Sequence, residues 1–413
     1  MTTPRSNATP GPGVVRLADV GPFDPTSTDF YLRPDYHAVL AALRAESPVY
    51  YVGDDLAVVT RYEDVREISR DPERFCSGQG ALVNDPIRTG RARDGAPPSI
   101  LFVDPPQHAR QRGLVNRKFT PRAVGQMEAD IRAIARTVFD RVGEGAEPID
   151  AVEHLTAPIP LLVIAELLGI PDGDRSDFRR WSDAVIESSD RPVEDTIALI
   201  TELHAFLTAH LEAKLREPGD DLVSMLGRAE LDGRRLGPDD VFSWLLTLLV
   251  AGNETTRTLL SGGMVVLAEH PDQRARLAAD PTAIPIAVEE CLRWVTPIQT
   301  MCRTVVADTT LGGTRLRSGD YLIMMYASAN RDEAAYGPTA GSFDAARPVN
   351  PAHLAFGFGE HLCLGAALAR MEARIFFEEL LTRFPDYQIA GSPVRVPSTL
   401  VCGIASLPVA LRG

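Results

Sequence analysis

One cysteine stands in a context that favours a reactive or metal-binding sulfur. The five cysteines are widely spaced, odd in number and free of any Cys-x-x-Cys pair, so neither a disulfide framework nor a zinc site is indicated. Cys363 differs from the others because Gly357, Gly359 and Gly365 surround it in the segment LAFGFGEHLCLGAALARME. Glycine permits a tight or left-handed backbone, which can bring amide groups close to a sulfur atom.

An apolar pattern of helical period begins directly after Cys363. A helix that starts there would point its N-terminal amides and the positive end of its dipole at the sulfur, and would lower the thiol pKa. The local pattern leaves two interpretations open: a buried cysteine in a glycine-rich helix cap, or a thiolate. A zinc site built on His361 and Cys363 fails on ligand number, because zinc usually takes three or four protein ligands.

An acid and an alcohol interrupt a second, apolar helix. The pattern predicts this helix over residues 238–269, from a favourable Pro-Asp start to the residue before His-Pro. Its middle, VFSWLLTLLVAG, is apolar nearly all round, which is typical of a core helix. Glu254 and Thr255 follow in AGNETT, and a buried carboxylate is costly unless it is hydrogen-bonded or hydrated. The pattern alone does not decide whether the helix meets solvent there.

The segment around Cys363 resembles, nearly residue for residue, the haem-binding signature of the cytochrome P450 family. The resemblance implies haem b as the cofactor and Cys363 as the proximal ligand of its iron. It also implies that Phe356 packs beside the sulfur and that His361 lies near a haem propionate. Gly357 and Gly365 belong to the same signature. A thiolate ligand donates electron density that favours cleavage of an O–O bond.

AGNETT is similar to the motif of the distal helix in the same family. By this resemblance Ala251 and Gly252 leave room for dioxygen, while Glu254 and Thr255 relay protons to it. Cleavage of dioxygen requires two protons, so an acid can supply them and a hydroxyl with bound water can position them. The implied activity is the hydroxylation or epoxidation of a small molecule with O2.

Several charged residues have a structural interpretation within the same resemblance. Glu290 and Arg293 lie at i and i+3 in AVEECLRW and are similar to the family's Glu-x-x-Arg motif, with Arg347 in FDAARP as a third partner. We expect a buried network without a catalytic role. The resemblance also assigns cations to the two haem propionates. They are His108 and Arg112, at i and i+4, and Arg303 in MCRTVVAD.

Composition excludes some classes of protein. The chain has 413 residues, of which 45% are hydrophobic, and its formal net charge of -14 argues against binding to nucleic acid. No apolar run reaches the eighteen or so residues that span a bilayer, and no signal-peptide pattern opens the sequence. We therefore expect a cytoplasmic protein with no membrane span. Residues 1–20 lack apolar periodicity and are expected to form a flexible arm before a single domain over residues 21–413.

The predicted fold is mainly α with small β-sheets. A helix is predicted in YHAVLAALRAES, followed by a hairpin of VYYV and LAVVT. Helical signals dominate residues 121–384, with strand-like runs in RTVVADTTLGG and DYLIMMYA and again in the tail. The resemblance implies the cytochrome P450 fold, in which haem lies between a long distal helix and the helix after the cysteine.

Family analogy also implies a pocket for a hydrophobic substrate, such as a steroid, terpenoid, fatty acyl chain or natural-product intermediate. Its expected lining comes from the loop over residues 82–100, the distal helix, the segment 298–301 and the tail. The named positions are Leu82, Val83, Ile100, Leu248, Ala251, Thr255, Ile298, Gln299, Thr300, Met301, Leu400 and Val401.

Electrons are expected to come from other proteins, because the chain has no flavin or dinucleotide motif and no room for a reductase domain. We expect a monomer served by a ferredoxin and its reductase. An acidic ferredoxin is expected to dock near the basic residues Arg110, Arg117 and Lys118.

Two other functions remain open from the sequence. A haem-thiolate enzyme of the same fold could catalyse peroxide-driven oxidation or C–C cleavage, although a peroxygenase does not need the proton relay that Glu254 and Thr255 imply. A non-catalytic haem protein would use the fold as a sensor or scaffold and would consume no NADPH.

Overall fold

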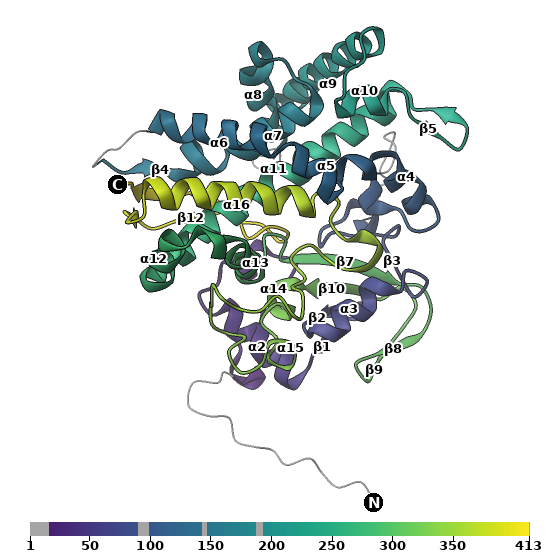
Figure 1. Ribbon diagram of the computed structural model, residues 1–413. Coiled ribbons are helices and arrows are strands. Elements are labelled where there is room, and N and C mark those ends of the chain that lie inside the picture. Colours follow the sequence, from purple (N-terminus) through teal and green to yellow (C-terminus); the bar gives the residue numbers. More distant parts are fainter. Residues whose placement is uncertain (1–15, 90–98, 143–146, 187–192, 413) are drawn as a thin grey trace, which may run out of the picture.

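The computed structural model describes residues 16–89, 99–142, 147–186 and 193–412 (Figure 1). Most of the arm predicted over residues 1–20 lies outside the described residues. Of its last positions, Leu17 and Val20 pack against an apolar cluster of the sheet. The part of the predicted substrate loop over residues 90–98 also lies outside the described residues.

A five-stranded sheet forms one side of the molecule (Figure 1). Its strands, in spatial order, are β1 (Val49–Tyr51), β2 (Leu56–Val59), β10 (Tyr321–Met325), β7 (Thr300–Val305) and β3 (Phe75–Cys76). Strands β2 and β10 pair in parallel, and the other neighbours pair antiparallel. All five residues of β10 are buried, because apolar clusters cover both faces of the sheet. Helix α3 (Tyr62–Arg70) contributes to one cluster and α2 (Tyr36–Glu46) to the other.

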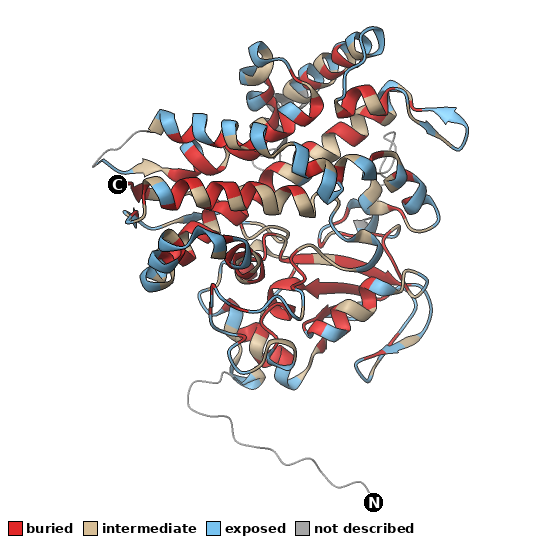
Figure 2. Ribbon diagram, viewed as in Figure 1, coloured by how far each residue is buried: buried red, intermediate tan, exposed pale blue. Residues whose placement is uncertain are grey.

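The longest described helix, α11 (Pro238–Glu269), runs through the helical part of the molecule. Its 32 residues give a length of about 48 Å at 1.5 Å per residue. The helix begins with a proline at its first turn, and the Asp240 carboxylate accepts the backbone N–H of Gly237 at 2.8 Å. It packs against α7 (Pro158–Leu168), α13 (Ile284–Val295) and α16 (Ala366–Arg383). Figure 2 shows buried residues along these helices and in the strands β7 and β10.

The remaining elements complete a mainly helical architecture, as predicted. The other α-helices are α1 (Thr28–Leu32), α4 (Gln107–Val115), α5 (Pro121–Gln126), α6 (Glu128–Val142), α8 (Arg175–Ile186), α9 (Val193–Arg216), α10 (Leu222–Leu226), α12 (Pro271–Ala279), α14 (Tyr326–Ala329) and α15 (Glu333–Tyr336). The small sheets comprise β11 (Gln388–Ile389), β14 (Pro408–Ala410) and β4 (Ile149–Asp150), and the pairs β5 (Glu230–Leu231) with β6 (Arg234–Arg235), β8 (Thr309–Leu311) with β9 (Thr314–Leu316), and β12 (Val394–Arg395) with β13 (Ile404–Ser406).

The sequence-based boundaries agree with the structure for the long helix, the first hairpin and α2. Within the described ranges, no helix is both long enough and apolar enough to cross a bilayer.

Candidate functional site

The loop before α16 fixes the backbone around Cys363. Gly357 and Gly359 have φ angles of 70° and 72°, which confirms the expected left-handed backbone. A Cβ on Gly359 would lie 2.0 Å from the carbonyl oxygen of Ser69, so this loop packs tightly against the end of α3. The backbone N–H of Cys363 donates to the carbonyl of Phe356 at 2.9 Å. These contacts hold the sulfur-bearing residue on a constrained turn.

The thiol of Cys363 does not have the lowered pKa that the sequence suggested. Helix α16 begins at Ala366, with Gly365 as its N-cap, so the helix starts three residues later than predicted. Cys363 is exposed, yet protein surrounds it closely enough that burial raises the pKa of its thiol. A hydrogen bond from the Gly365 amide and the charges of Arg112 and Arg370 oppose this effect without overcoming it. Binding of a metal ion can still displace the thiol proton.

Four nitrogen-bearing side chains gather next to this loop. The rings of His108, on α4, and His361 have centroids 4.3 Å apart. Arg112, one turn after His108, donates to the carbonyl of Glu360 at 3.4 Å. Burial lowers the pKa of His361 to about 3, and the neighbouring charges of Arg303, His108 and Arg112 add to the effect. The structure therefore brings together all four residues that the sequence assigned to propionates.

The side chains of His108, Arg112, Arg303 and His361 form a set of donors that suits a negatively charged group. Arg303, on β7, is 4% exposed and donates to the carbonyl of Cys302. In the described part of the chain, neither Arg303 nor Arg112 forms an ion pair with a carboxylate. The nearby Asp104 accepts the backbone N–H groups of Ser77 and Gly78 at 2.7 and 2.8 Å. A buried arginine without a carboxylate is costly, so this donor set suits the two propionates of a haem whose iron takes the open thiol.

The acid of the long helix points into the protein rather than into solvent. Glu254 is 7% exposed and forms an ion pair with Arg257, one turn later on α11. Its Oε1 has no hydrogen-bond partner among the described residues and lies beside Gly403, where a Cβ would approach to 3.2 Å. The Thr255 hydroxyl donates to the carbonyl of Ala251 at 2.7 Å. Ala251 is exposed although buried residues flank this part of α11, as expected for a position that borders space for a ligand.

Gly252 and Asn253 serve contacts between helices. A Cβ on Gly252 would lie 2.6 Å from Cδ1 of Ile164, so the missing side chain allows α7 to approach α11. The expectation that this glycine also leaves room for dioxygen stays a prediction. The amide of Asn253 donates to the hydroxyl of Ser182, on α8, at 3.1 Å.

Two of the predicted substrate segments lie side by side. Ile298 and Val401 form an isolated β-bridge, and the backbone N–H of Gln299 donates to the carbonyl of Leu400 at 2.8 Å. The Gln299 side chain donates to the carbonyls of Ser398 and Val401, and the Thr300 hydroxyl donates to that of Thr399 at 2.6 Å. These polar side chains hold the tail in place.

The other predicted substrate residues differ in burial. Val83 is 6% exposed and packs in the sheet cluster with α2. The half-buried apolar positions among all the predicted substrate residues are Leu82, Ile100, Leu248, Ile298, Met301, Leu400 and Val401.

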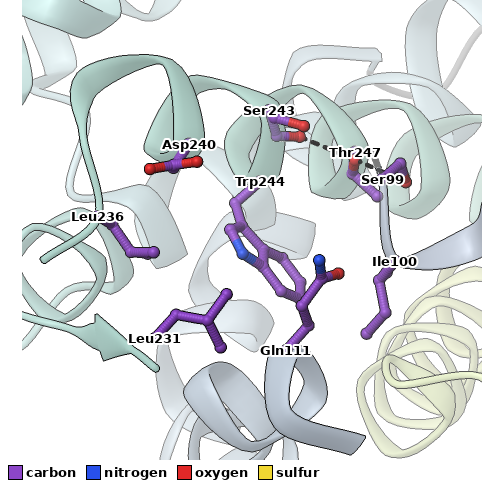
Figure 3. A pocket seen from close by; sticks show the side chains of 9 residues that line it. All are labelled: Ser99, Ile100, Gln111, Leu231, Leu236, Asp240, Ser243, Trp244 and Thr247. Atoms are coloured by element: carbon purple, nitrogen blue, oxygen red, sulfur yellow. Dashed lines mark hydrogen bonds between the residues drawn. The ribbon is translucent and has the colours of Figure 1, made fainter. Parts of the chain in front are cut away.

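A small cavity lies between α4 and the first half of α11 (Figure 3). Its volume of about 30 Å³ has room for about two water molecules and is too small for a substrate. The Thr247 hydroxyl lies 3.1 Å from that of Ser99 at one end of the cavity (Figure 3). The lining residues are Ser99, Ile100, Gln111, Leu231, Leu236, Asp240, Ser243, Trp244 and Thr247.

The predicted Glu-x-x-Arg network is present and buried. The carboxylate of Glu290 accepts two hydrogen bonds of 2.7 Å from the guanidinium of Arg293. Arg347 donates to the same carboxylate at 3.1 Å. Arg293 also donates to the carbonyls of Asn330 and Ala340 at 2.7 and 2.8 Å. These bonds tie α13 to the segment that precedes the cysteine loop.

Sequence reasoning missed several polar neighbours of this site. The Arg257 partner of Glu254 could have been found from the i, i+3 spacing on one helix. Ser77, whose hydroxyl lies 3.2 Å from Nε2 of His361, is 284 positions away and carried no local signal. Among the described residues, no cluster of three His, Cys, Asp or Glu side chains could hold a metal ion.

Comparisons with known proteins agree with this geometry. A family model described as cytochrome P450 matches residues 282–386, which include Cys363, Arg303 and Glu290. The chain is 38% identical over 390 residues to steroid C26-monooxygenase of Mycobacterium tuberculosis, with 92% of this chain and 95% of the relative covered. It is 36% identical over 425 aligned positions to methyl-branched lipid omega-hydroxylase of Mycobacterium bovis, with 98% and 97% covered. A solved Mycobacterium marinum cytochrome P450 in complex with pseudoionone is 36% identical, with a TM-score of 0.85 and coverage of 98% of this chain and 100% of that chain.

Proposed function

This chain belongs to the cytochrome P450 family and is a haem b monooxygenase that acts on hydrophobic substrates, and we propose that Cys363 is the thiolate ligand of its iron. The observation that carries the assignment is the open thiol of Cys363 on a glycine-fixed turn, beside four cationic or imidazole side chains. Bound haem supplies the iron at which dioxygen is activated. His108, Arg112, Arg303 and His361 would hold the propionates.

Glu254 and Thr255 would deliver protons to dioxygen. The Thr255 hydroxyl donates to the Ala251 carbonyl, so its oxygen remains free to accept a hydrogen bond from a water molecule. One carboxylate oxygen of Glu254 binds Arg257, and the other has no partner in the described part of the chain. This second oxygen can exchange protons with water that enters beside Gly403. The two residues are adjacent on α11 and their side chains point about 100° apart, so a chain of water would have to join them.

The proposed substrate is a steroid or a methyl-branched lipid that is hydroxylated at the end of its alkyl chain. Two relatives that align over nearly the whole chain are named for oxidation of these compounds, one at C26 and one at the omega position. The half-buried apolar residues Leu82, Ile100, Leu248, Met301 and Leu400 suit such a ligand. The side chains of Gln299 and Thr300 already donate hydrogen bonds to backbone carbonyls of the tail, so we assign them no polar contact with the substrate.

Titration of the purified haem protein tests the substrate class. A steroid with an intact side chain and a methyl-branched fatty acid should each change the spin state of the iron, and products should carry the new hydroxyl at the chain end. A steroid without the side chain is the matched control. Binding and oxidation of a macrolide or terpenoid alone, with no response to either proposed class, would reject this assignment.

Replacement of the cysteine tests the iron ligand. Cys363→Ser should abolish the absorption spectrum that is typical of a thiolate-bound ferrous–CO complex, because a neutral hydroxyl is a poor substitute for a thiolate. Cys402→Ser is the control, since Cys402 is half-buried in the tail. If Cys363→Ser retains the thiolate spectrum, another residue binds the iron.

We also propose that the protein acts as a monomer in the cytoplasm and receives electrons from a ferredoxin and its reductase. Of the three expected docking residues, Arg110 is paired with Asp232 and Lys118 with Asp220. Arg117 is exposed and has no carboxylate partner among the described residues. Arg117 is therefore the most available of the three for an acidic partner. A sensor or scaffold of the same fold would consume no NADPH in a reconstituted system with both redox proteins, which separates it from the monooxygenase.

A further inference from the structure

A second, partly buried acid lies next to the Glu-x-x-Arg network and has no part in it. Glu289 precedes Glu290 on α13, and successive residues of a helix point about 100° apart. Glu290 faces Arg293 and Arg347, whereas Glu289 faces α16 and the cysteine loop. Its Oε1 accepts Nε of Arg370 at 2.6 Å, and its Oε2 accepts Nη2 at 3.0 Å. The two groups thus form a two-pronged ion pair between α13 and α16.

The same carboxylate also contacts a buried histidine. Nε2 of His353 lies 3.2 Å from Oε2 of Glu289, although the geometry is too bent for a full hydrogen bond. Nδ1 of His353 accepts the backbone N–H of Ala355 at 3.2 Å, so Nε2 carries the proton that faces the carboxylate. Burial alone would raise the pKa of Glu289, but His353 and Arg370 together lower it to about 2. Glu289 is therefore negatively charged at neutral pH.

Both partners of Glu289, Arg370 and His353, contact the ring of Phe356. The guanidinium carbon of Arg370 lies 4.5 Å from the centre of the ring, and the His353 ring has its centroid 5.6 Å away. The carbonyl of Phe356 in turn accepts the backbone N–H of Cys363. A continuous set of contacts therefore runs from the carboxylate of Glu289, through two side chains and one ring, to the residue that carries the sulfur.

Charge makes this arrangement more than a structural support. The positive charge of Arg370 lies against the Phe356 ring, 4.5 Å from its centre, and the backbone of Phe356 binds that of Cys363, so this charge is close to the turn that carries the sulfur. Glu289 offsets most of that charge, because the ion pair is nearly neutral when seen from a distance. Without Glu289, the unbalanced guanidinium would draw electron density toward the sulfur and away from a metal bound there.

We propose that Glu289 is a positioning residue for the sulfur ligand, which holds Arg370 and His353 against Phe356 and neutralises Arg370, and so sets the electron donation from Cys363 to the iron. The proposal rests on the assignment of Cys363 as the ligand, and it predicts the reduction potential of the iron rather than the activity. Loss of the acid should raise the potential, because reduced iron carries less positive charge. Loss of the arginine should lower it.

Equilibrium titration with redox dyes, on the haem-loaded variants and without any electron-transfer protein, tests these signs. Glu289→Gln should raise the ratio of reduced to oxidised iron at a fixed potential by about tenfold, which is about 59 mV for one electron. Arg370→Gln should shift the potential in the opposite direction, and the double variant should lie near the wild type. Glu128→Gln is the matched control. It removes an acid that binds Arg374, one turn further along α16, at 2.9 Å, and it should leave the potential unchanged.

Shifts of the same sign in both single variants would reveal a loosened loop and would overturn the proposal, as would unchanged potentials. If Glu289→Gln does not retain haem, the direction in which Arg370→Gln shifts the reduction potential tests the proposal by itself. The wild-type ferrous–CO spectrum distinguishes failure of the ligand assignment from failure of the proposed role of Glu289. A protein that lacks the thiolate spectrum contradicts the ligand assignment, whereas a normal spectrum with unchanged potentials contradicts only the role of Glu289.

Discussion

The hydroxyl of Thr255 already donates to the carbonyl one turn earlier, so its chemical use is as an acceptor that holds water. Thr255→Ala removes that acceptor without touching the residues assigned to the propionates. We expect the variant to keep its haem and consume NADPH, but to release peroxide and form product about a hundredfold more slowly, as is usual when proton transfer is lost. Peroxide and product measured in the same reaction check this.

Thr255→Ser is the control for this experiment, because it retains the hydroxyl. Its ratio of product to NADPH should stay close to that of the wild type. Fully coupled turnover by Thr255→Ala would show that the protons reach dioxygen by another route.

A buried carboxyl on α16 predicts how stability changes with pH. Glu372 is 3% exposed, and burial alone raises its pKa to about 8. The unfolded chain loses this proton near the ordinary value of 4.5, whereas the folded chain keeps it until about 8. Between these values the unfolded state binds fewer protons, so the free energy of unfolding decreases as pH rises, by at most about 1.4 kcal/mol per pH unit.

Glu372→Gln keeps the shape of the side chain and removes this pH dependence. The gain in Tm over the wild type should be small near pH 5 and should grow steadily toward pH 8, in thermal unfolding of the haem-loaded proteins. Glu212→Gln, on the exposed side of α9, should show no such trend. A difference in Tm that is constant over this pH range would mean that Glu372 is ionised in the folded protein.

Single residues were predictable from sequence where their signal was local. The i, i+4 spacing of His108 and Arg112 placed them together, and the glycines around Cys363 indicated its turn. Glu289 could not be recognised, because its partners come from two other segments and a charge beside the Glu-x-x-Arg motif looks like a surface residue. The direction of the Cys363 pKa shift was wrong, because burial outweighs the amide and the nearby cations.

At the scale of elements, the contact between the cysteine loop and α3 sets the position of the sulfur. Gly359→Ala would place a methyl group 2.0 Å from the backbone oxygen of Ser69, at a φ of 72° that alanine disfavours. Backbone cannot move aside as a flexible side chain can, so we expect a cost of about 3 kcal/mol or more. The variant should lose haem faster to an apomyoglobin acceptor and should unfold at lower temperature.

Gly113→Ala is the control for this effect on stability. Gly113 lies within α4, and a Cβ there would meet no atom within 4 Å. Alanine in an exposed helix should stabilise the protein by about 0.5–1 kcal/mol. Equal haem retention by the two variants would mean that the loop tolerates a shift away from α3.

Helix boundaries followed from the sequence wherever proline or glycine fixed them, as at the start of α11. The start of α16 was predicted three residues too early, because Cys363, Leu364 and Gly365 form a turn whose last amide binds the sulfur. The neighbours within the five-stranded sheet were not predictable. Strand β2 pairs with β10, and apolar alternation in a strand does not name its partner.

At the scale of the whole molecule, the net charge of -14 leaves basic patches as exceptions on an acidic surface. Arg117→Glu should slow reduction by an acidic ferredoxin about tenfold at low salt and weaken the dependence of that rate on salt. Stopped-flow reduction at several ionic strengths measures both effects. Arg276→Glu, on α12 at the far side of the molecule from α4, is the control (Figure 1). Unchanged rates for Arg117→Glu would place the electron donor elsewhere.

The parallel pairing of β2 with β10 has a consequence for synthesis. Leu56 and its partner Tyr321 leave the ribosome about 265 residues apart, which takes roughly 13–53 s at 5–20 residues per second. During this interval β1 can cover only one edge of β2, and the open edge carries Ala57, Val58 and Val59. Nascent chains with an unpaired apolar edge tend to associate with one another. Yield in a recombinant host should therefore depend on shielding by chaperones until the C-terminal quarter of the chain has emerged.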